Sequence, residues 1–151
     1  MAMKPTISRR HLPHIYVQGA CYFLTFRLAR TQPSPLSEAE LTAVAGHIAR
    51  ITPGTCRAWV IMPDHVHLLY QSAVDEALSK TLKALKGSSS RTLGKLFARS
   101  APVWQDETFD HVVRDERELI ETWRYIEGNP VRKGLVAVPE SYQWSSAWNR
   151  T

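Results

Sequence analysis

The sequence has 151 residues and a formal net charge of +5, from 19 Lys and Arg against 14 Asp and Glu. This length fits one domain and is enough to bury a core without support from disulfides or metal. The excess of basic over acidic residues favours an anionic partner, either nucleic acid or an acidic membrane surface. We expect a single domain over 1–151, with a basic N-terminal arm at 1–20 and a tail at 137–151.

Cys21 and Cys56 are far apart in the sequence, and each lies in an apolar run. Such thiols behave as small hydrophobic groups, so we expect free cysteines and a reducing, cytoplasmic setting. No apolar run approaches the ~18 residues that span a bilayer, and no apolar region follows the basic N-terminus. We therefore expect a soluble protein without a membrane partner.

The first half of the chain predicts strand, helix and hairpin. After the irregular arm, residues 21–29 (CYFLTFRLA) are rich in aromatic and β-branched residues at roughly alternating positions, which is typical of a strand. Ser37 and Glu40 have capping-box spacing and open a helix with one apolar face. Residues 56–62 and 65–71 then predict two strands joined by a tight turn.

The second half predicts a long helix, strand and a last helix. Residues 75–100 predict a helix with leucines on one face, from Leu78 to Leu96, and basic residues on the other. These basic residues are Lys80, Lys83, Arg91 and Lys95. Residues 101–115 indicate one or two short strands. Asp115 begins the last helix, which we expect to end near Gly128, because Pro130 follows.

The order of these elements is strand, helix, strand, strand, helix, strand. This order resembles a ferredoxin-like βαββαβ core with an antiparallel sheet, to which a C-terminal helix is added. The predicted fold class is therefore α+β.

His65 and His67 lie two residues apart in the strand HVHLLYQ. Alternate residues of a strand share one face at a separation of about 6.5–7 Å, so both rings point the same way. Burying two imidazoles is unfavourable unless both find partners, and one metal ion serves both. Asp64, Asp106, Asp110 and His111 are candidates for further ligands. Two satisfied polar rings on a sheet surface remain the alternative.

Tyr125 and Asn129 lie one turn apart on the last helix, off the stripe formed by Leu119, Ile120, Trp123 and Ile126. A surface tyrosine is common and carries no function by itself. Combined with an ion site and a basic chain, however, the pair provides a nucleophile and a neutral oxygen ligand for attack on a phosphodiester. Glu121 or a metal-bound water could take the phenol proton.

Two stretches carry a family resemblance. DHVHLL (64–69) resembles the histidine-hydrophobic-histidine (HUH) motif, and WRYIEGNPVRKGLV (123–136) resembles the tyrosine motif of single-tyrosine HUH transposases. The wider chain, from about Arg9 to Ser146, is similar to the branch of REP-associated tyrosine transposases. Further stretches that carry this similarity are YFLTFRL, LKGSSSRTL, WQDETFDHVVRDERE and YQWSS.

The resemblance implies a mechanism. His65, His67 and Asn129 match ligands of a catalytic Mg²⁺ or Mn²⁺, and Tyr125 matches the nucleophile. Such enzymes cleave single-stranded DNA beside a hairpin, leaving a 5′-phosphotyrosine link and a free 3′-hydroxyl. The REP-associated branch acts at repetitive extragenic palindromes and reads a short single-stranded tag. Some related transposases are homodimers in which the tyrosine helix completes the partner's site.

Basic side chains could follow the DNA backbone, a contact that is sensitive to salt and indifferent to sequence. The predicted set is Arg9, Arg10, Lys80, Lys83, Arg91, Lys95, Arg132 and Lys133. Two other functions remain open beside a strand transferase. One is a module that binds hairpin DNA with little or no catalysis, and the other is a metal hydrolase with water as its nucleophile.

Overall fold

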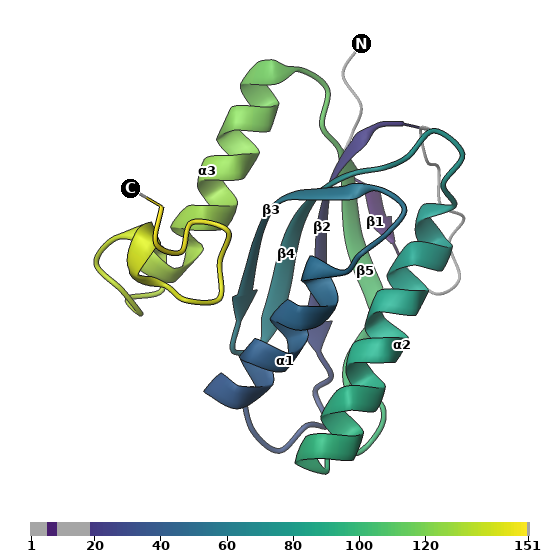
Figure 1. Cartoon of the computed structure of the whole chain (residues 1–151), viewed down its shortest axis with the longest axis vertical. Helices are drawn as coiled ribbons and strands as arrows, with labels where there is room; N and C mark the ends of the chain where they lie inside the picture. The colour runs from purple at the N-terminus through teal and green to yellow at the C-terminus, as the bar shows by residue number, and fades with distance from the viewer. Residues whose placement is uncertain (1–5, 9–18, 151) are drawn as a thin grey trace.

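The computed structural model describes residues 6–8 and 19–150 (Figure 1). Eight helices and strands and one 3₁₀ helix follow one another within these residues. They are β1 (Thr6–Ser8), β2 (Cys21–Leu28), α1 (Glu38–Ala49), β3 (Thr55–Met62), β4 (His65–Gln71), α2 (Leu78–Phe97), β5 (Trp104–Val112), α3 (Glu116–Arg132) and η1 (Pro139–Ser141). No helix in these ranges is long and apolar enough to cross a membrane.

The strands form one antiparallel sheet in the order β1-β5-β2-β4-β3. Its four-stranded core, β5-β2-β4-β3, has α1 between β2 and β3 and α2 between β4 and β5 in the chain. This is the ferredoxin-like βαββαβ arrangement, so the predicted fold class is confirmed. The added helix is α3.

Strand β1 corrects the expectation of an irregular arm at 1–20. Thr6–Ser8 pairs with β5, with Thr6 opposite Asp110 and Ser8 opposite Thr108. Three residues are too few for an alternating pattern to stand out, and it is the open edge of β5 that gives them a hydrogen-bonding partner. Arg9 and Arg10 lie outside the described residues.

Helices α1 and α2 cover one face of the sheet (Figure 1). Val66 and Leu68 of β4 point into the core beneath these helices, together with Leu24 and Phe26 of β2. The apolar face of α2 contributes Leu78, Leu82, Leu85 and Leu93. Leu96, predicted on this face, is instead 70% exposed in the last turn of the helix.

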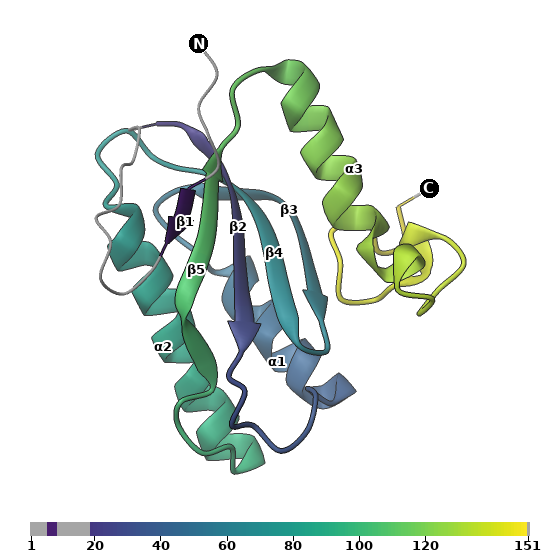
Figure 2. The same cartoon turned by 180° about the vertical axis from the view of Figure 1, so that it is seen from behind.

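Helix α3 packs on the opposite face, against β3 and β4 (Figure 2). A second apolar cluster lies beneath it, in which Ile126 of α3 meets Val60, Met62 and Leu69 of the sheet. Figure 2 shows that β2 and β5 lie beside this helix and not beneath it. The part of this sheet face over β2 and β5 is therefore left for a site.

Helix α3 runs to Arg132 and contains Pro130, which corrects the predicted end near Gly128. Proline removes one helical hydrogen bond, and this usually ends or kinks a helix. Here Pro130 is itself buried, and Asn129 beside it is buried as well. Lys133 N still donates to Asn129 O at 3.0 Å. Tertiary packing thus outweighs the local penalty and extends the helix by one turn.

The tail fastens α3 to the sheet. Ser145 forms a bridge with Val60 of β3, and the Tyr142 hydroxyl donates to Ile61 O at 2.7 Å. Arg150 then binds the carboxylate of Glu127 on α3, with nitrogen to oxygen distances of 2.8 and 2.6 Å. Because one short segment contacts both elements, α3 has a fixed position over β3 and β4.

A buried ion pair joins α1 to the segment after α2. Arg99 donates to both carboxylate oxygens of Glu40, at 2.5 and 2.8 Å, and to the carbonyls of Ser34 and Pro35. Both side chains of the pair are almost fully buried. Glu40 also completes the predicted capping box with Ser37. The hydrogen bonds from Arg99 lower the pKa of Glu40 below its ordinary value of 4.5.

Replacing Arg99 by methionine should lower the free energy of unfolding by about 3 kcal/mol, because it leaves a buried carboxylate without its partner. Urea unfolding followed by circular dichroism measures this loss. Arg117→Met is the matched control, since Arg117 pairs with Glu121 on the exposed surface and should change stability by less than about 1 kcal/mol.

The same pair predicts a pH dependence. The folded protein holds the Glu40 pKa below that of the unfolded chain, so the unfolded state binds the proton more readily. Stability from this pair is therefore present above about pH 5 and is lost as the pH falls through the folded pKa. Equal losses in Arg99→Met and Arg117→Met, or an acid-induced loss that Arg99→Met does not reduce, would contradict this account.

Candidate active site

The two histidines of β4 lie together on the face that carries α3. Their ring centroids are 4.7 Å apart, and each residue is only 5% exposed. Val66, between them, points into the other core. The predicted convergence of His65 and His67 is therefore what the strand geometry produces.

Each imidazole already has a hydrogen bond at Nδ1. The Asp64 carboxylate lies 2.7 Å from Nδ1 of His65, and the Thr25 hydroxyl lies 2.7 Å from Nδ1 of His67. Partners of this kind orient the rings of metal-binding histidines and fix their tautomers. They leave Nε2 as the nitrogen that each ring offers to a further group. Asp64, a predicted ligand candidate, therefore orients the His65 ring through Nδ1 and is not itself placed as a ligand.

Burial keeps both imidazoles neutral. It lowers the pKa of His67 to about 3, with further lowering from His65, Arg27, Arg132 and Lys133 nearby. Burial also lowers the pKa of His65, although Asp64 opposes this shift. Neutral imidazole is the form that binds a metal ion, so the pair is ready to do so at neutral pH.

Asn129 lies beside the histidines, as predicted. Its Nδ2 is 3.1 Å from Nε2 of His65. The side chain is buried, only 3% exposed, although the helical wheel placed it away from the apolar stripe of α3. The reason is that α3 approaches the sheet along a face that includes Ile126, Glu127 and Asn129, whereas Ile120 is exposed. A flip of the Asn129 side-chain amide would place its oxygen, Oδ1, where Nδ2 now lies.

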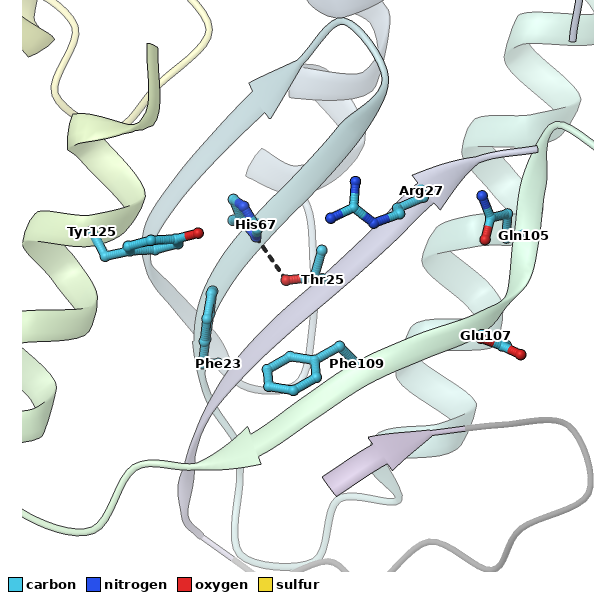
Figure 3. A pocket seen from close by; sticks show the side chains of 8 residues that line it. All are labelled: Phe23, Thr25, Arg27, His67, Gln105, Glu107, Phe109 and Tyr125. Atoms are coloured by element: carbon cyan, nitrogen blue, oxygen red, sulfur yellow. Dashed lines mark hydrogen bonds between the residues drawn. The ribbon is translucent and has the colours of Figure 1, made fainter. Parts of the chain in front are cut away.

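Tyr125 completes the cluster from the same helix. Its ring contacts Phe23 and His67 at centroid distances of 5.9 and 5.7 Å, yet the residue is 47% exposed. Figure 3 shows its hydroxyl directed toward His67. The tyrosine thus stands at the rim of the histidine pair, with its oxygen accessible to a substrate.

Arg132 folds back over the tyrosine. Its guanidinium carbon lies 4.2 Å from the centroid of the Tyr125 ring, and its Nη2 donates to Tyr125 O at 2.5 Å. A Cβ atom at Gly128 would come within 2.9 Å of Arg132 Nη1. Glycine at this position lets the arginine lie close to the helix, where its positive charge faces the site.

The donor set fits a divalent ion only in part. No group of three His, Cys, Asp or Glu side chains in residues 6–8 and 19–150 is arranged to hold one. His65 and His67 supply two nitrogens, and Asn129 could supply an oxygen. A hard ion such as Mg²⁺ or Mn²⁺ prefers oxygen, so the remaining positions suit water or phosphate oxygens.

A cavity of about 410 Å³ opens beside these residues (Figure 3). Strand β2 lines it with Phe23, Thr25 and Arg27, which the sequence analysis did not single out. The sheet register places Thr25 opposite His67 and Arg27 opposite His65. Every second residue of β2 therefore lies on the same face as the histidines. The alternation predicted for β2 would identify these residues once the pairing of β2 with β4 is known.

The predicted DNA-binding residues fall into three groups. Arg132 and Lys133 lie near the site, close enough to lower the pKa of His67. Lys80, Lys83, Arg91 and Lys95 are exposed on α2, on the other face of the sheet. Arg9 and Arg10 lie outside the described ranges.

The remaining candidates, three for metal ligands and one for the general base, lie elsewhere. His111 binds Glu118 near the start of α3. Glu121 is exposed and pairs with Arg117, so it does not line the cavity. Asp106 and Asp110 are on β5 and are also absent from the cavity wall.

Known proteins give the same fold and sequence pattern. The model of a family described as "Transposase IS200 like" matches residues 35–129. The chain is 29% identical to a REP-associated tyrosine transposase of Haemophilus influenzae, over 87% of this chain and 81% of that one. It is 24% identical to one from Escherichia coli, over 87% and 78% of the two chains.

Two solved structures share the fold. A REP-associated tyrosine transposase bound to a REP hairpin superposes with a TM-score of 0.75 and 22% identity, over 91% of this chain and 82% of that one. A transposase from Deinococcus radiodurans gives a TM-score of 0.53 and 23% identity, over 78% and 95%. The family match covers more than half of the chain. The chain therefore belongs to the IS200-like transposases, and it is similar to their branch of REP-associated tyrosine transposases.

Proposed function

We propose that this protein is a metal-dependent single-strand DNA endonuclease and strand transferase, which acts at REP-type hairpins through a 5′-phosphotyrosine intermediate. The observation that carries the proposal is the contact of Tyr125 with His67, 5.7 Å between ring centroids, beside His65 and Asn129. All four side chains come from one chain, so a nucleophile and an ion site meet without a second copy.

His65, His67 and Asn129 would hold Mg²⁺ or Mn²⁺. When bound, such an ion polarises a phosphate oxygen and offsets the charge that develops during displacement. Asp64 and Thr25 hold the two imidazoles through their Nδ1 atoms, so that Nε2 of His67 stays available and Nε2 of His65 faces the Asn129 amide. Because the rings are buried and preorganised, little ordering is needed when substrate arrives.

Tyr125 is the proposed nucleophile. Its phenol oxygen bonds to phosphorus while the bond from phosphorus to the 3′ oxygen breaks, and the leaving oxygen takes a proton to become a 3′-hydroxyl. The phenol loses its own proton in this step. Attack of a 3′-hydroxyl on the phosphotyrosine reverses the reaction and joins strands, without a nucleotide cofactor.

Positive charge around the site suits a phosphodiester substrate. Arg27, Arg132 and Lys133 lie close enough to act electrostatically on His67. The basic face of α2 lies on the far side of the sheet and offers a second, separate surface for DNA phosphates. A REP hairpin is bound by the relative of known structure, and this supports a hairpin as the partner here.

Tyr125→Phe should abolish the covalent adduct and strand cleavage, because it removes only the attacking oxygen. The measurement incubates protein with Mn²⁺ and a single-stranded oligonucleotide that carries a REP palindrome and its flanks, then resolves the products on a denaturing gel. Wild type should give a protein-linked band that Tyr125→Phe lacks.

Tyr142→Phe is the matched control, since the hydroxyl of this tail residue donates to Ile61 O of β3 and Tyr142 does not line the cavity. It should still form the adduct. Cleavage that survives in Tyr125→Phe would indicate a hydrolase with water as its nucleophile. Tight hairpin binding by wild type with no cleavage in either metal would indicate a binding module.

Thr25→Val should weaken metal binding by about 10–100-fold, because it removes the hydroxyl that holds Nδ1 of His67 and keeps the shape of the side chain. Mn²⁺ titration followed by electron paramagnetic resonance measures the affinity directly. The cleavage rate at saturating Mn²⁺ should change much less than the Mn²⁺ concentration needed for half-saturation.

Thr31→Val, at an exposed position outside the cavity, controls for the loss of a hydroxyl. It should bind Mn²⁺ as wild type does. An unchanged Mn²⁺ affinity in Thr25→Val would show that the Thr25 hydroxyl has no part in metal binding.

A further inference from the structure

Helices α1 and α2 lie side by side on the face of the sheet away from Tyr125 (Figure 1), and a second cavity opens between them. Its volume is about 460 Å³, within the range of small-molecule pockets, about 300–1,000 Å³. The end of α1 and the residues after it form one wall, with His47, Arg50, Ile51 and Thr52, and the middle of α2 forms the other. None of these four residues lines the cavity beside Tyr125.

The fully charged side chains of this cavity are all basic. They are Arg50, Lys83 and Arg91, and none of the described residues that line the cavity is acidic. Within residues 6–8 and 19–150, none of these three cations forms an ion pair. Other arginines do pair with glutamates, namely Arg99, Arg114, Arg117 and Arg150. Because three like charges around one space repel each other, an anion between them would be stabilising.

The two arginines converge on one histidine from different helices. His47 of α1 is held by Thr92 of α2, whose hydroxyl oxygen lies 2.8 Å from Nε2 of the imidazole. Burial lowers the pKa of His47, and the positive charges of Arg50 and Arg91 lower it further. Both guanidinium groups therefore lie close to the same imidazole in the wall of the cavity.

Each arginine also lies back along its own helix. A Cβ atom at Gly46 would lie 3.5 Å from Nη1 of Arg50, and one at Gly87 would lie 3.5 Å from Nη1 of Arg91. Each glycine precedes its arginine by four residues, which is about one helical turn. The guanidinium groups thus lie against the helix surface, and less ordering of these side chains is needed when an anion binds.

This arrangement suits a compact anion of high charge. A phosphate monoester carries about two negative charges at pH 7, and a second phosphate adds about one more. The charge of a diphosphate therefore matches that of Arg50, Lys83 and Arg91. Arginine also binds phosphate oxygens through paired N–H groups. A DNA strand, by contrast, carries one charge per phosphate, spread along its backbone.

The rest of the lining offers no platform for a nucleobase. Ile51, Ala84 and Leu85 supply apolar surface, and Thr52 and Ser88 supply hydroxyl groups. Among the described residues that line the cavity, none is a phenylalanine, tyrosine or tryptophan, on which a base could stack. Recognition would therefore depend on the diphosphate and not on a base attached to it.

We infer that the cavity between α1 and α2 is a binding site for a small-molecule diphosphate, either free pyrophosphate or the diphosphate group of a nucleotide. Arg50 and Arg91 bind the phosphates from the two walls, and Lys83 adds the third positive charge. A bound diphosphate would join the end of α1 to the middle of α2. The site is separate from the histidines and Tyr125, so the inference does not depend on the proposed function.

The test is isothermal titration calorimetry of the full chain in EDTA, which keeps divalent ions away from the histidines. The probes are inorganic phosphate, inorganic pyrophosphate, ADP and CDP. Pyrophosphate should bind about tenfold more tightly than phosphate, because it offers more charge and more acceptor oxygens to the arginines. ADP and CDP should bind equally. If both match pyrophosphate, the ligand is a nucleotide, and if both bind more weakly, it is free pyrophosphate.

Arg50→Met and Arg91→Met should each weaken pyrophosphate binding by about 10–100-fold, because each removes charge-assisted hydrogen bonds. Lys95→Met is the matched control, since it removes the same charge at an exposed position of α2 that does not line the cavity. It should keep the wild-type affinity. Both arginines are exposed, so the variants should fold, and thermal unfolding followed by circular dichroism checks this.

No measurable binding of pyrophosphate by wild type would overturn the inference. An equal loss of affinity in Lys95→Met and Arg91→Met would also overturn it, because it would indicate general attraction to the basic face of α2. A REP hairpin oligonucleotide that displaces pyrophosphate from wild type would assign the cavity to DNA instead. None of these results bears on the adduct formed by Tyr125.

Discussion

The register between β2 and β4 is the constraint on which the site depends. It places Thr25 opposite His67, so that a hydroxyl from one strand holds the imidazole of the next. It also places Phe23 and Arg27 on the same face as both histidines. A shift by one residue would turn all of these side chains into the core under α1 and α2, and would bring Leu24 and Phe26 to the surface. Core packing and the site are thus specified by the same pairing.

Helix α3 adds the second half of the site, and three contacts of different kinds hold it. Ile126 packs on the sheet, Asn129 donates to His65, and Glu127 binds Arg150 of the tail. These residues lie within a single turn of the helix. Tyr125, next to them in sequence, is consequently held at a fixed height above the histidines although much of its own surface is exposed.

Local sequence signals predicted most of the fold. The alternation in β2, the capping box at Ser37 and the His-x-His spacing each depend on neighbouring residues alone, and the structure shows the strand, the helix start and the shared face. The features that the sequence pattern did not predict depend on packing between segments that are distant in the sequence. Pro130 remains helical because its surroundings are buried, and Asn129 is buried because of the angle at which α3 meets the sheet.

The site was predictable to the same extent. His65, His67, Tyr125 and Asn129 were found from spacing and resemblance, and the structure brings all four together. Thr25, Arg27 and the β5 side chains were missed, because they enter the site only through strand pairing between distant segments. The basic face of α2 was found as a pattern, but a helical wheel cannot say on which side of the sheet it lies.

The ends of the chain also decide how two copies could meet. Thr6–Ser8 pairs with β5 at one edge of the sheet, and the tail bridges to Val60 of β3 at the other. Strands with open edges invite pairing with another chain, and here part of each edge already has a partner from the same molecule. These pairings shorten the stretch of backbone that β5 and β3 can offer to a second copy.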